Sequence, residues 1–167
     1  MFSVSGLVHS MSYDTHRNTL YYARWSSTKK NSVDALLHVG TKNQQKVTLL
    51  TLNLALAVEY EPWFQYLFIA AGSQILRYDT RSKTTHTIVT SRKLAFVVTV
   101  DPITEKVFWI DQPSAKDKKE HSLLYAAIGY QTATAAPGKT LWINCYTSEH
   151  DIVFSKTQTS NTSFVKL

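Results

Sequence analysis

Cysteine is nearly absent from this chain of 167 residues, which contains Cys145 alone. A single cysteine cannot form an intrachain disulfide, so the sequence excludes a small secreted domain held together by disulfides. Cys145 lies within the apolar run 141–146. We expect it to be a buried thiol without a nucleophilic role, because reactive thiols need a partly exposed and electropositive environment.

Long apolar runs are also missing. The N-terminal segment 1–8 lacks a basic region followed by a long apolar stretch, so it does not resemble a signal peptide. No run approaches the roughly 18 apolar residues that a membrane helix needs. The sequence therefore predicts either a soluble protein inside the cell or part of a larger protein whose targeting signal lies elsewhere.

Motifs of common catalytic and metal sites are absent as well. The six histidines are dispersed and show neither HExxH nor another metal-ligand spacing. The chain has no GxGxxG, GxxxxGK[ST] or GxSxG motif. We therefore predict no cofactor, no metal ion and no catalytic residue.

What the chain does contain suits β-strands and an acidic partner. Hydrophobic residues make up 44% and charged residues 18%, and Thr, Val, Tyr, Phe and Trp stand out. The formal net charge of +6 favours acidic partners through long-range attraction. The basic residues are scattered and form no known nucleic-acid module, so no nucleic-acid partner is expected.

Copies of one motif recur along the chain. The clearest copy lies in 100–111, where Asp101-Pro102 starts a turn and Phe108-Trp109-Ile110-Asp111 follows. Tyr21, Phe68 and Val153 stand in the place of Phe108, and the successive spacings are 47, 40 and 45 residues. A period of this size indicates an array of one supersecondary unit.

Each copy predicts short strands separated by turn residues. The expected strands are 6–12, 19–24, 35–39 and 46–51 in the first repeat, and 54–60, 66–71, 74–78 and 86–90 in the second. They are 94–100, 106–111, 122–128 and 130–135 in the third, and 141–145, 151–155 and 163–167 in the fourth. The pattern predicts an all-β, propeller-like fold with about three complete four-stranded blades and an incomplete fourth. We expect the chain to form a single partial propeller domain, 1–167, with repeats at about 5–51, 54–90, 94–136 and 140–167.

The third repeat resembles the YWTD blades of the low-density-lipoprotein receptor family, also called LDL-receptor class B repeats. Phe108-Trp109-Ile110-Asp111 stands where that family has Tyr-Trp-Thr-Asp after an Asp-Pro turn. The segments 75–79 and 87–89 resemble the family's third and fourth strands. The resemblance implies a ring of six blades, of which this chain would be a part, and a structural role for Asp101, Phe108, Trp109 and Asp111.

The other repeats depart from that pattern. Neither Tyr21-Tyr22-Ala23-Arg24 nor Phe68-Ile69-Ala70-Ala71 keeps the closing Asp. The turn acid is Asp14 in the first repeat and Glu59 or Glu61 in the second, and Tyr146 stands there in the fourth. Other propellers with similar blade length remain alternatives, among them a four-bladed ring, since 66–79 slightly resembles a hemopexin-type blade.

Asp101 and Asp111 could be interpreted as an acid–base pair, but a structural role is favoured. One acid lies in a turn and the other ends a strand, where carboxylates commonly accept backbone N–H bonds. The aromatic residues that recur at the repeat spacing are expected to pack between blades. They are Tyr21, Tyr22, Phe68, Phe108, Trp109 and Phe154.

The loops between second and third strands are the candidate binding site. Two of them are expected to be long, 24–34 and 112–121, and in a propeller they emerge on the same face as the connections between blades. The candidate ligand-binding residues on this face are Arg24, Trp25, Lys29, Lys30, Arg92, Lys93, Lys116, Lys118 and Lys119. The alternative is that these lysines only keep the loops solvated. Trp25 and Trp63 are candidates for stacking.

The sequence therefore favours a non-enzymatic module that binds a protein ligand, as a fragment of a larger ring in an extracellular or cell-surface receptor-like protein. Remaining blades or a second copy would be needed to close that ring. Asn161 begins an N-glycosylation sequon, which matters only in a secreted chain. The alternatives are a propeller hydrolase with a central metal ion, for which Glu59 and Asn144 are the plausible ligands, and a degenerate fragment without independent function.

Overall fold

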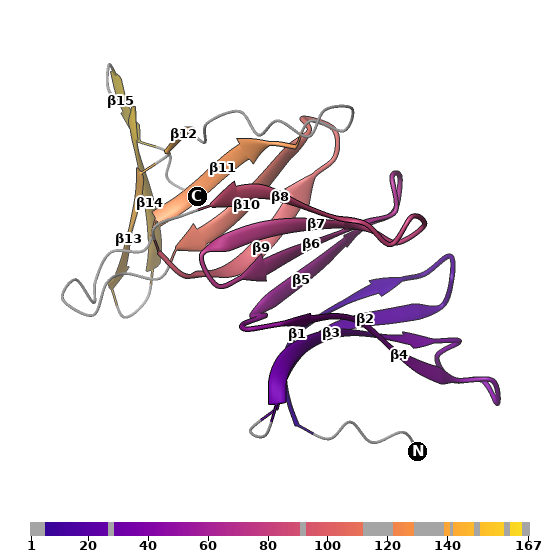
Figure 1. Cartoon of the computed structure of the whole chain (residues 1–167). Helices are drawn as coiled ribbons and strands as arrows, with labels where there is room; N and C mark the ends of the chain where they lie inside the picture. The colour runs from indigo at the N-terminus through magenta and orange to yellow at the C-terminus, as the bar shows by residue number, and fades with distance from the viewer. Residues whose placement is uncertain are drawn as a thin grey trace.

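The computed structural model describes residues 6–26, 29–90, 93–111, 122–128, 139–140, 142–148, 151–158 and 161–164, and the side chains within 6–25, 31–90, 93–111 and 123–128. The described residues are strands, turns and short connections, and none of them forms a helix that could cross a membrane. They form four antiparallel sheets, which we call blades 1 to 4 (Figure 1). The predicted all-β, propeller-like fold is confirmed.

Each blade is built from strands that are consecutive in the chain. Blade 1 contains β1 (Leu7–Asp14), β2 (Thr19–Ser26), β3 (Lys29–Leu37) and β4 (Gln45–Leu52). Blade 2 contains β5 (Ala57–Glu61), β6 (Tyr66–Ala71), β7 (Gln74–Asp79) and β8 (Thr85–Thr90). Blade 3 contains β9 (Ala95–Asp101), β10 (Lys106–Asp111), β11 (Ser122–Ala127) and β12 (Lys139–Thr140). Blade 4 contains β13 (Trp142–Ser148), β14 (Asp151–Gln158) and β15 (Asn161–Phe164).

The four anchor residues of the repeat occupy one register position. Tyr21, Phe68, Phe108 and Val153 are each the third residue of the second strand of their blade. Two second strands, β6 and β10, cover the predicted residues 66–71 and 106–111. The sequence spacing therefore located the second strand of each blade correctly.

One predicted segment differs from the structure, and another is not tested by it. The region 24–34 is not a long loop, because β2 continues to Ser26 and β3 begins at Lys29. The polar residues of this region belong to a β-hairpin. At its base Ala23 pairs with Val33, and both side chains are buried. The predicted fourth strand of the third repeat, 130–135, lies outside the described residues, and β12 is the strand that pairs with β11.

An acid ends the first strand of blades 1, 2 and 3 and shapes the turn that follows. Asp14 accepts the backbone N–H groups two and three residues ahead, at 3.0 and 3.2 Å. Glu61 does the same at 2.8 Å for both bonds, and Asp101 at 3.0 and 3.4 Å. Of the two acids expected in the second repeat, Glu61 rather than Glu59 is therefore the turn acid. These bonds supply partners for N–H groups that the strand ladder cannot reach.

Blade 4 departs from this pattern, and its equivalent residue differs from the one expected. Ser148 pairs with Asp151 at the end of β13, as Asp14 pairs with Thr19 at the end of β1. The hairpin between β13 and β14 is two residues shorter than the others. In the other repeats the turn acid stands seven residues before the anchor, and seven residues before Val153 is Tyr146. Strand pairing instead places Ser148 next to the turn.

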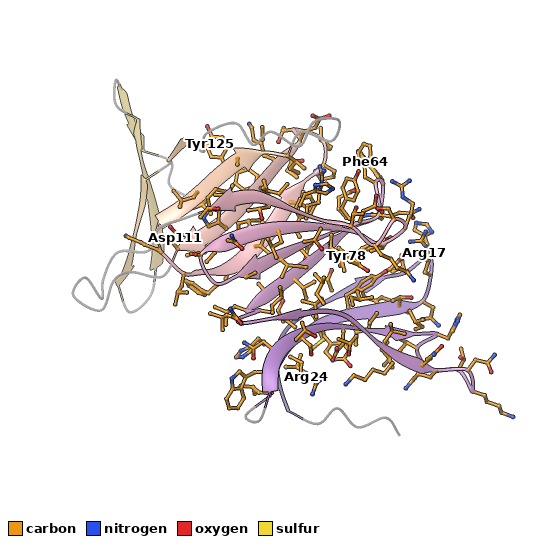
Figure 2. All side chains as sticks on the ribbon, in the orientation of Figure 1. Arg17, Arg24, Phe64, Tyr78, Asp111 and Tyr125 are labelled. Atoms are coloured by element: carbon orange, nitrogen blue, oxygen red, sulfur yellow. The ribbon has the colours of Figure 1, made fainter. Side chains whose placement is uncertain are left out.

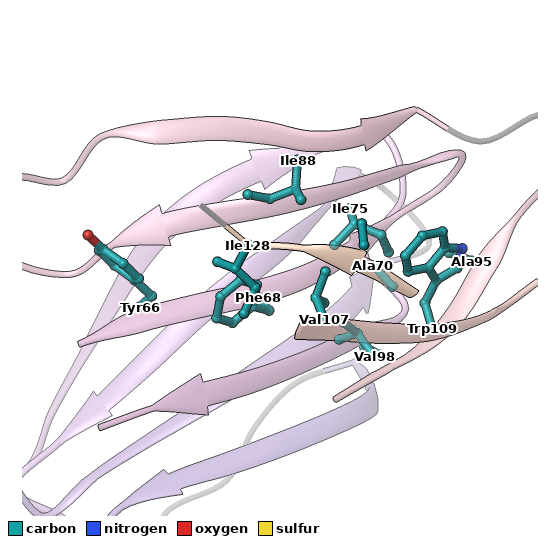
Figure 3. Close-up of a cluster of buried hydrophobic side chains, with 12 residues drawn as sticks. Tyr66, Phe68, Ala70, Ile75, Ile88, Ala95, Val98, Val107, Trp109 and Ile128 are labelled. Atoms are coloured by element: carbon teal, nitrogen blue, oxygen red, sulfur yellow. The ribbon is translucent and has the colours of Figure 1, made fainter. Parts of the chain in front are cut away.

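The core lies between the blades (Figure 3). One cluster joins blades 1 and 2 through Tyr21 and Leu67, and Tyr21 packs against Tyr60 with ring centroids 5.0 Å apart. The other cluster joins blades 2 and 3 through Phe68 and Trp109. The expected packing of aromatic residues between blades is thus present for Tyr21, Phe68 and Trp109.

Two other aromatic residues of that set, Tyr22 and Phe108, differ from the expectation, and the sixth is not tested. Tyr22 is buried but belongs to neither cluster, because it points to the opposite face of β2 from Tyr21. Phe108 is only partly buried and lies against Tyr125 with centroids 5.9 Å apart. The side chain of Phe154 lies outside the described ones.

Candidate functional site

The blades present two ends that carry different side chains. The connections from second to third strands and from one blade to the next lie at one end, which we call the loop end. The hairpin turns 15–18, 38–44, 62–65, 80–84 and 102–105 lie at the other, which we call the turn end. Figure 2 shows Arg17 and Phe64 on the turn-end side, with Arg24 and Asp111 on the opposite side.

The residues of the predicted binding face fall into three groups. Arg24 and Trp25 lie on β2, and Lys29 and Lys30 begin β3, although the side chains of these two lysines are outside the described ones. Lys93 lies in the connection between β8 and β9 and is partly buried. The remaining four, Arg92, Lys116, Lys118 and Lys119, lie outside the described residues.

Trp25 is an exposed aromatic side chain at the loop end, with 43% of its surface accessible. It pairs across the sheet with Leu7, which is 57% exposed, so the two side chains form a small apolar patch. Gly6 allows the start of β1 to approach the backbone of Trp25 closely. A Cβ at position 6 would lie 2.5 Å from the carbonyl oxygen of Trp25, and the φ of Gly6 is +103°. A larger residue at position 6 would push the start of β1 away from Trp25.

Arg24 forms an ion pair within blade 1. Its Nε lies 2.9 Å from Oδ2 of Asp34, and Nζ of Lys46 lies 3.3 Å from the same oxygen. Asp34 is fully buried, so two cations compensate one carboxylate that water does not reach. The hydroxyl of Tyr22 lies in this environment, where burial raises its pKa to about 12, the Asp34 carboxylate adds to the rise and Arg24 opposes it.

Asp101 and Asp111 each have a structural partner and do not form a pair. They lie at opposite ends of the β9–β10 pair: Asp101 ends β9 and pairs with Lys106, and Asp111 ends β10 and pairs with Ala95. Five residues of strand separate these ends by about 17 Å. The indole Nε1 of Trp109 donates to Oδ1 of Asp111 at 3.0 Å in a buried position.

The turn role of Asp101 is also visible in its pKa. The hydroxyl of Thr104 donates to it, and this bond contributes most to holding the pKa of Asp101 below its ordinary value. Loss of hydration acts in the opposite direction, and the backbone N–H groups of Thr104 and Ile103 add to the lowering of this pKa. Acid–base chemistry at this pair is therefore not supported.

Glu59 lies on the first strand of blade 2, where burial raises its pKa and a hydrogen bond with Ser12 lowers it in part. Among the described residues, no three His, Cys, Asp or Glu side chains are grouped so that they could hold a metal ion. The side chain of Asn144, the other expected ligand at the ring axis, is outside the described ones.

The turn end carries apolar side chains that the sequence interpretation largely missed. Ile103 is 80% exposed, Trp63 66% and Phe64 36%. Phe64 stacks on Tyr66 with centroids 6.1 Å apart, and the guanidinium of Arg77 lies 4.7 Å from the centre of the Tyr66 ring. Their exposure could have been expected from the sequence, because they lie two or three residues after a turn acid and therefore within a turn.

Arg17 links the turns of blades 1 and 2. It donates to the hydroxyl of Tyr60 at 3.4 Å and to the side-chain oxygen of Gln65. The two neighbouring turns are thus connected by polar bonds as well as by the core below them. The turn end is a supported surface rather than a set of separate hairpins.

Comparison with solved structures shows the fold. A chain in the crystal structure of a nidogen/laminin complex superimposes with a TM-score of 0.63 at 9% identity, over 95% of this chain and 64% of that one. An auxiliary nutrient binding protein from Bacteroides thetaiotaomicron matches with a TM-score of 0.65 at 12% identity, over 96% of this chain and 37% of that one. A protein of the same description from Bacteroides ovatus has a TM-score of 0.67, 10% identity, and coverage of 96% and 37%.

These matches support a propeller-like arrangement of blades, and at such low identity they show the fold alone. No family model and no curated protein matches the sequence. The chain spans about two thirds of the nidogen/laminin chain and little more than one third of each nutrient-binding protein.

Proposed function

We propose that this chain is part of a non-enzymatic, protein-binding propeller of the YWTD type, from a receptor-like extracellular protein. The exposed pair of Trp25 and Leu7, held at the loop end by a rigid blade, is the observation that carries the proposal. An aromatic side chain displayed on a fixed strand is well suited to anchor a partner, because little conformational entropy is lost on binding. A nidogen/laminin complex and two nutrient-binding proteins among the structural neighbours support a binding role.

The ligand surface is the loop end. Trp25 provides the apolar anchor, and the basic residues of the same end attract an acidic partner and accelerate its association. Arg24 orients this surface from inside the blade through its ion pair with Asp34. Lys29, Lys30, Arg92, Lys93, Lys116, Lys118 and Lys119 complete the proposed set.

The assignment to a larger extracellular protein accounts for two further features. The resemblance to YWTD blades implies a ring of six, and the blades beyond the four sheets of the described residues would come from the remainder of a longer chain or from a second copy. Asn161, the first residue of β15, would be a glycosylation acceptor in a secreted protein.

A matched pair of tryptophan variants tests the loop end. Peptide ligands are first selected by display against the immobilised wild-type chain, and their affinities for Trp25→Ala and Trp63→Ala are then measured by calorimetry. Loss of a central aromatic anchor costs about 2 kcal/mol or more, so Trp25→Ala should weaken binding at least about 30-fold while Trp63→Ala leaves it within about threefold. The reverse pattern would move the site to the turn end.

The charge contribution is tested separately. Reversal of Lys29, Lys30, Lys116 and Lys119 to Glu should slow the association of acidic peptides at low salt, and the difference should shrink as salt is added. Equal association rates at low salt would remove the lysines from the proposed site but leave Trp25 in place.

A further inference from the structure

Three turns at the turn end are joined to one another at Gln65. Its side-chain oxygen accepts a hydrogen bond from Arg17 of blade 1. Its carbonyl oxygen accepts two bonds from Thr80, one from the backbone N–H at 3.1 Å and one from the hydroxyl at 2.8 Å. These bonds hold the turns in a fixed relation, and we call the surface that they form the Gln65 platform. It consists of the turns 15–18, 62–65 and 80–84.

The tip of this platform is aromatic and exposed. Trp63 is 66% and Phe64 36% exposed, and neither belongs to a core cluster. Their backbone N–H groups both donate to the carboxylate of Glu61 at 2.8 Å, and the ring of Phe64 stacks on Tyr66 (Figure 2). A fixed hairpin thus presents two adjacent aromatic side chains to water, where contact with apolar surface is unfavourable.

The charged side chains around this tip are basic. The three turns contain Arg17, Arg81 and Lys83, all of them exposed, and no Asp or Glu. The acids that precede the turns accept backbone N–H groups of the turns. Arg81 also lies 3.6 Å from one of these acids, Asp79, and its side chain is still 57% exposed. The outward surface of the platform therefore carries positive charge beside its aromatic tip.

Aromatic and basic side chains at a hairpin tip match the chemistry of a membrane surface that contains anionic lipids. Tryptophan is enriched at the boundary between headgroups and acyl chains, where its ring is in an apolar layer and its N–H reaches water. Each cation near an anionic lipid surface contributes about 1 kcal/mol of attraction. A projecting tip can also enter a fluid lipid layer directly, whereas a folded protein partner would need a pocket of matching shape.

We propose that the Gln65 platform binds the surface of a membrane that contains anionic lipids. Trp63 and Phe64 insert at the level of the headgroups, and the basic residues of the platform contact lipid phosphates and carboxylates. Such a contact lies in the interface and does not cross the bilayer. Because the loop end is at the opposite end of the blades, the bound chain presents Trp25 away from the membrane. The contact does not depend on the ligand-binding proposal.

Binding of the purified chain to lipid vesicles tests the aromatic contact. The wild type should sediment with vesicles of phosphatidylcholine that contain about 30% phosphatidylserine. Trp63→Ala should lower the partition coefficient at least about tenfold, because it removes the larger of the two inserted rings. Trp25→Ala is the matched control: it removes the same ring from the opposite end and should leave the coefficient within about twofold. Circular dichroism checks that both variants fold.

Fluorescence quenching tests insertion, as distinct from adsorption by charge alone. Phosphatidylcholine that is brominated near the top of its acyl chains quenches indole rings that reach the interface. Quenching should therefore be similar in the wild type and in Trp25→Ala, and it should be largely lost in Trp63→Ala.

Neutralisation of single cations tests the charge contribution. Arg81→Gln and Lys83→Gln should each lower the partition coefficient on anionic vesicles about fivefold at low salt, with a smaller effect as salt is added. On vesicles of pure phosphatidylcholine the two variants should match the wild type, because these lipids carry no net charge.

Three results would overturn the proposal. A wild-type chain that does not bind anionic vesicles at low salt would exclude the membrane. Equal partitioning or equal quenching of Trp63→Ala and the wild type would place the lipid contact elsewhere on the chain. Loss of peptide affinity in Trp63→Ala, in a wild-type chain that ignores vesicles, would make the turn end a protein-binding surface instead.

Discussion

At the scale of single residues, Tyr22 shows how one position along a strand decides an environment. Tyr21 and Tyr22 are adjacent in sequence and both are buried, but Tyr21 packs between blades while Tyr22 lies beside the ion pair of Asp34. The hydroxyl of Tyr22 is buried and has no hydrogen-bond partner among the residues that the structure describes. A buried hydroxyl without a partner reduces stability, since its hydration is lost and not replaced.

Replacement of Tyr22 by Phe should therefore stabilise the chain at neutral pH, by up to about 1 kcal/mol. The pKa of Tyr22 rises from its ordinary value of 10.0 to about 12 on folding, so above pH 10 the hydroxyl ionises more readily in the unfolded chain and stability falls as pH rises towards 12. Tyr22→Phe should accordingly flatten the fall of stability in alkali. Urea denaturation at about pH 7 and about pH 11 measures both effects.

Tyr13→Phe is the control for this change, because the hydroxyl of Tyr13 lies at the surface and donates to Asn18. A loss of stability in Tyr22→Phe greater than about 1 kcal/mol would mean that the hydroxyl has a partner after all, and would contradict the environment described for it.

At the scale of elements, the hairpin after the first strand of blades 1, 2 and 3 follows one rule. An acid ends the strand, and the residue four places later has a positive φ: Asn18 at 50°, Gln65 at 61° and Glu105 at 52°. The second strand begins at the next residue. This left-handed residue turns the chain back and costs free energy in any residue with a Cβ, least in Asn and Gly.

Glu105→Gly should stabilise the chain by about 0.5–1 kcal/mol, because glycine adopts the left-handed conformation without strain. Ile103→Gly in the same turn is the control and should lower stability slightly, since its φ is not positive. Thermal denaturation of the two variants gives the comparison. A lower melting temperature for Glu105→Gly would show that its side chain contributes more than the strain costs.

The sequence predicted the strands of the second repeat well because apolar residues there alternate with clear turn residues. It did not predict the hairpin of 24–34, because polar and basic residues occupy both strands of it. Those residues are compatible with the solvated end of a hairpin as well as with a loop. Which of the two forms depends on Val33 and Ala23 packing against the next blade, a contact between distant segments.

At the scale of the whole molecule, stability comes from the surfaces between blades. Phe68 is fully buried between blades 2 and 3 (Figure 3). Each blade alone would leave one apolar surface uncovered, so neighbouring blades stabilise one another. This arrangement makes the contact surfaces, rather than any single sheet, the cooperative unit.

Phe68→Ala should reduce the free energy of unfolding by about 3–5 kcal/mol, the usual cost of an aromatic cavity in a core. Phe64→Ala, four residues earlier at the turn end, removes the same ring from a partly exposed position and should cost about 1 kcal/mol or less. Chemical denaturation measures both. Equal losses for the two variants would contradict the placement of the core between blades.

The sequence alone determined the repeat, its second strands and the turn acids Asp14 and Asp101, because these depend on local preferences and on the alternation of side chains along a strand. The choice of Glu61 over Glu59 needed the structure. Only the tertiary structure decided which equivalent residues are buried. Val58 and Met11 hold the same place in their strands, yet one is covered by a preceding blade and the other is not. The tertiary structure likewise pairs Arg24 with Asp34 in an ion pair inside blade 1. It also places Trp25 at the surface beside Leu7. The burial of a side chain and the pairing of a charge both depend on the residues that pack against it, and these residues are often far away in the sequence.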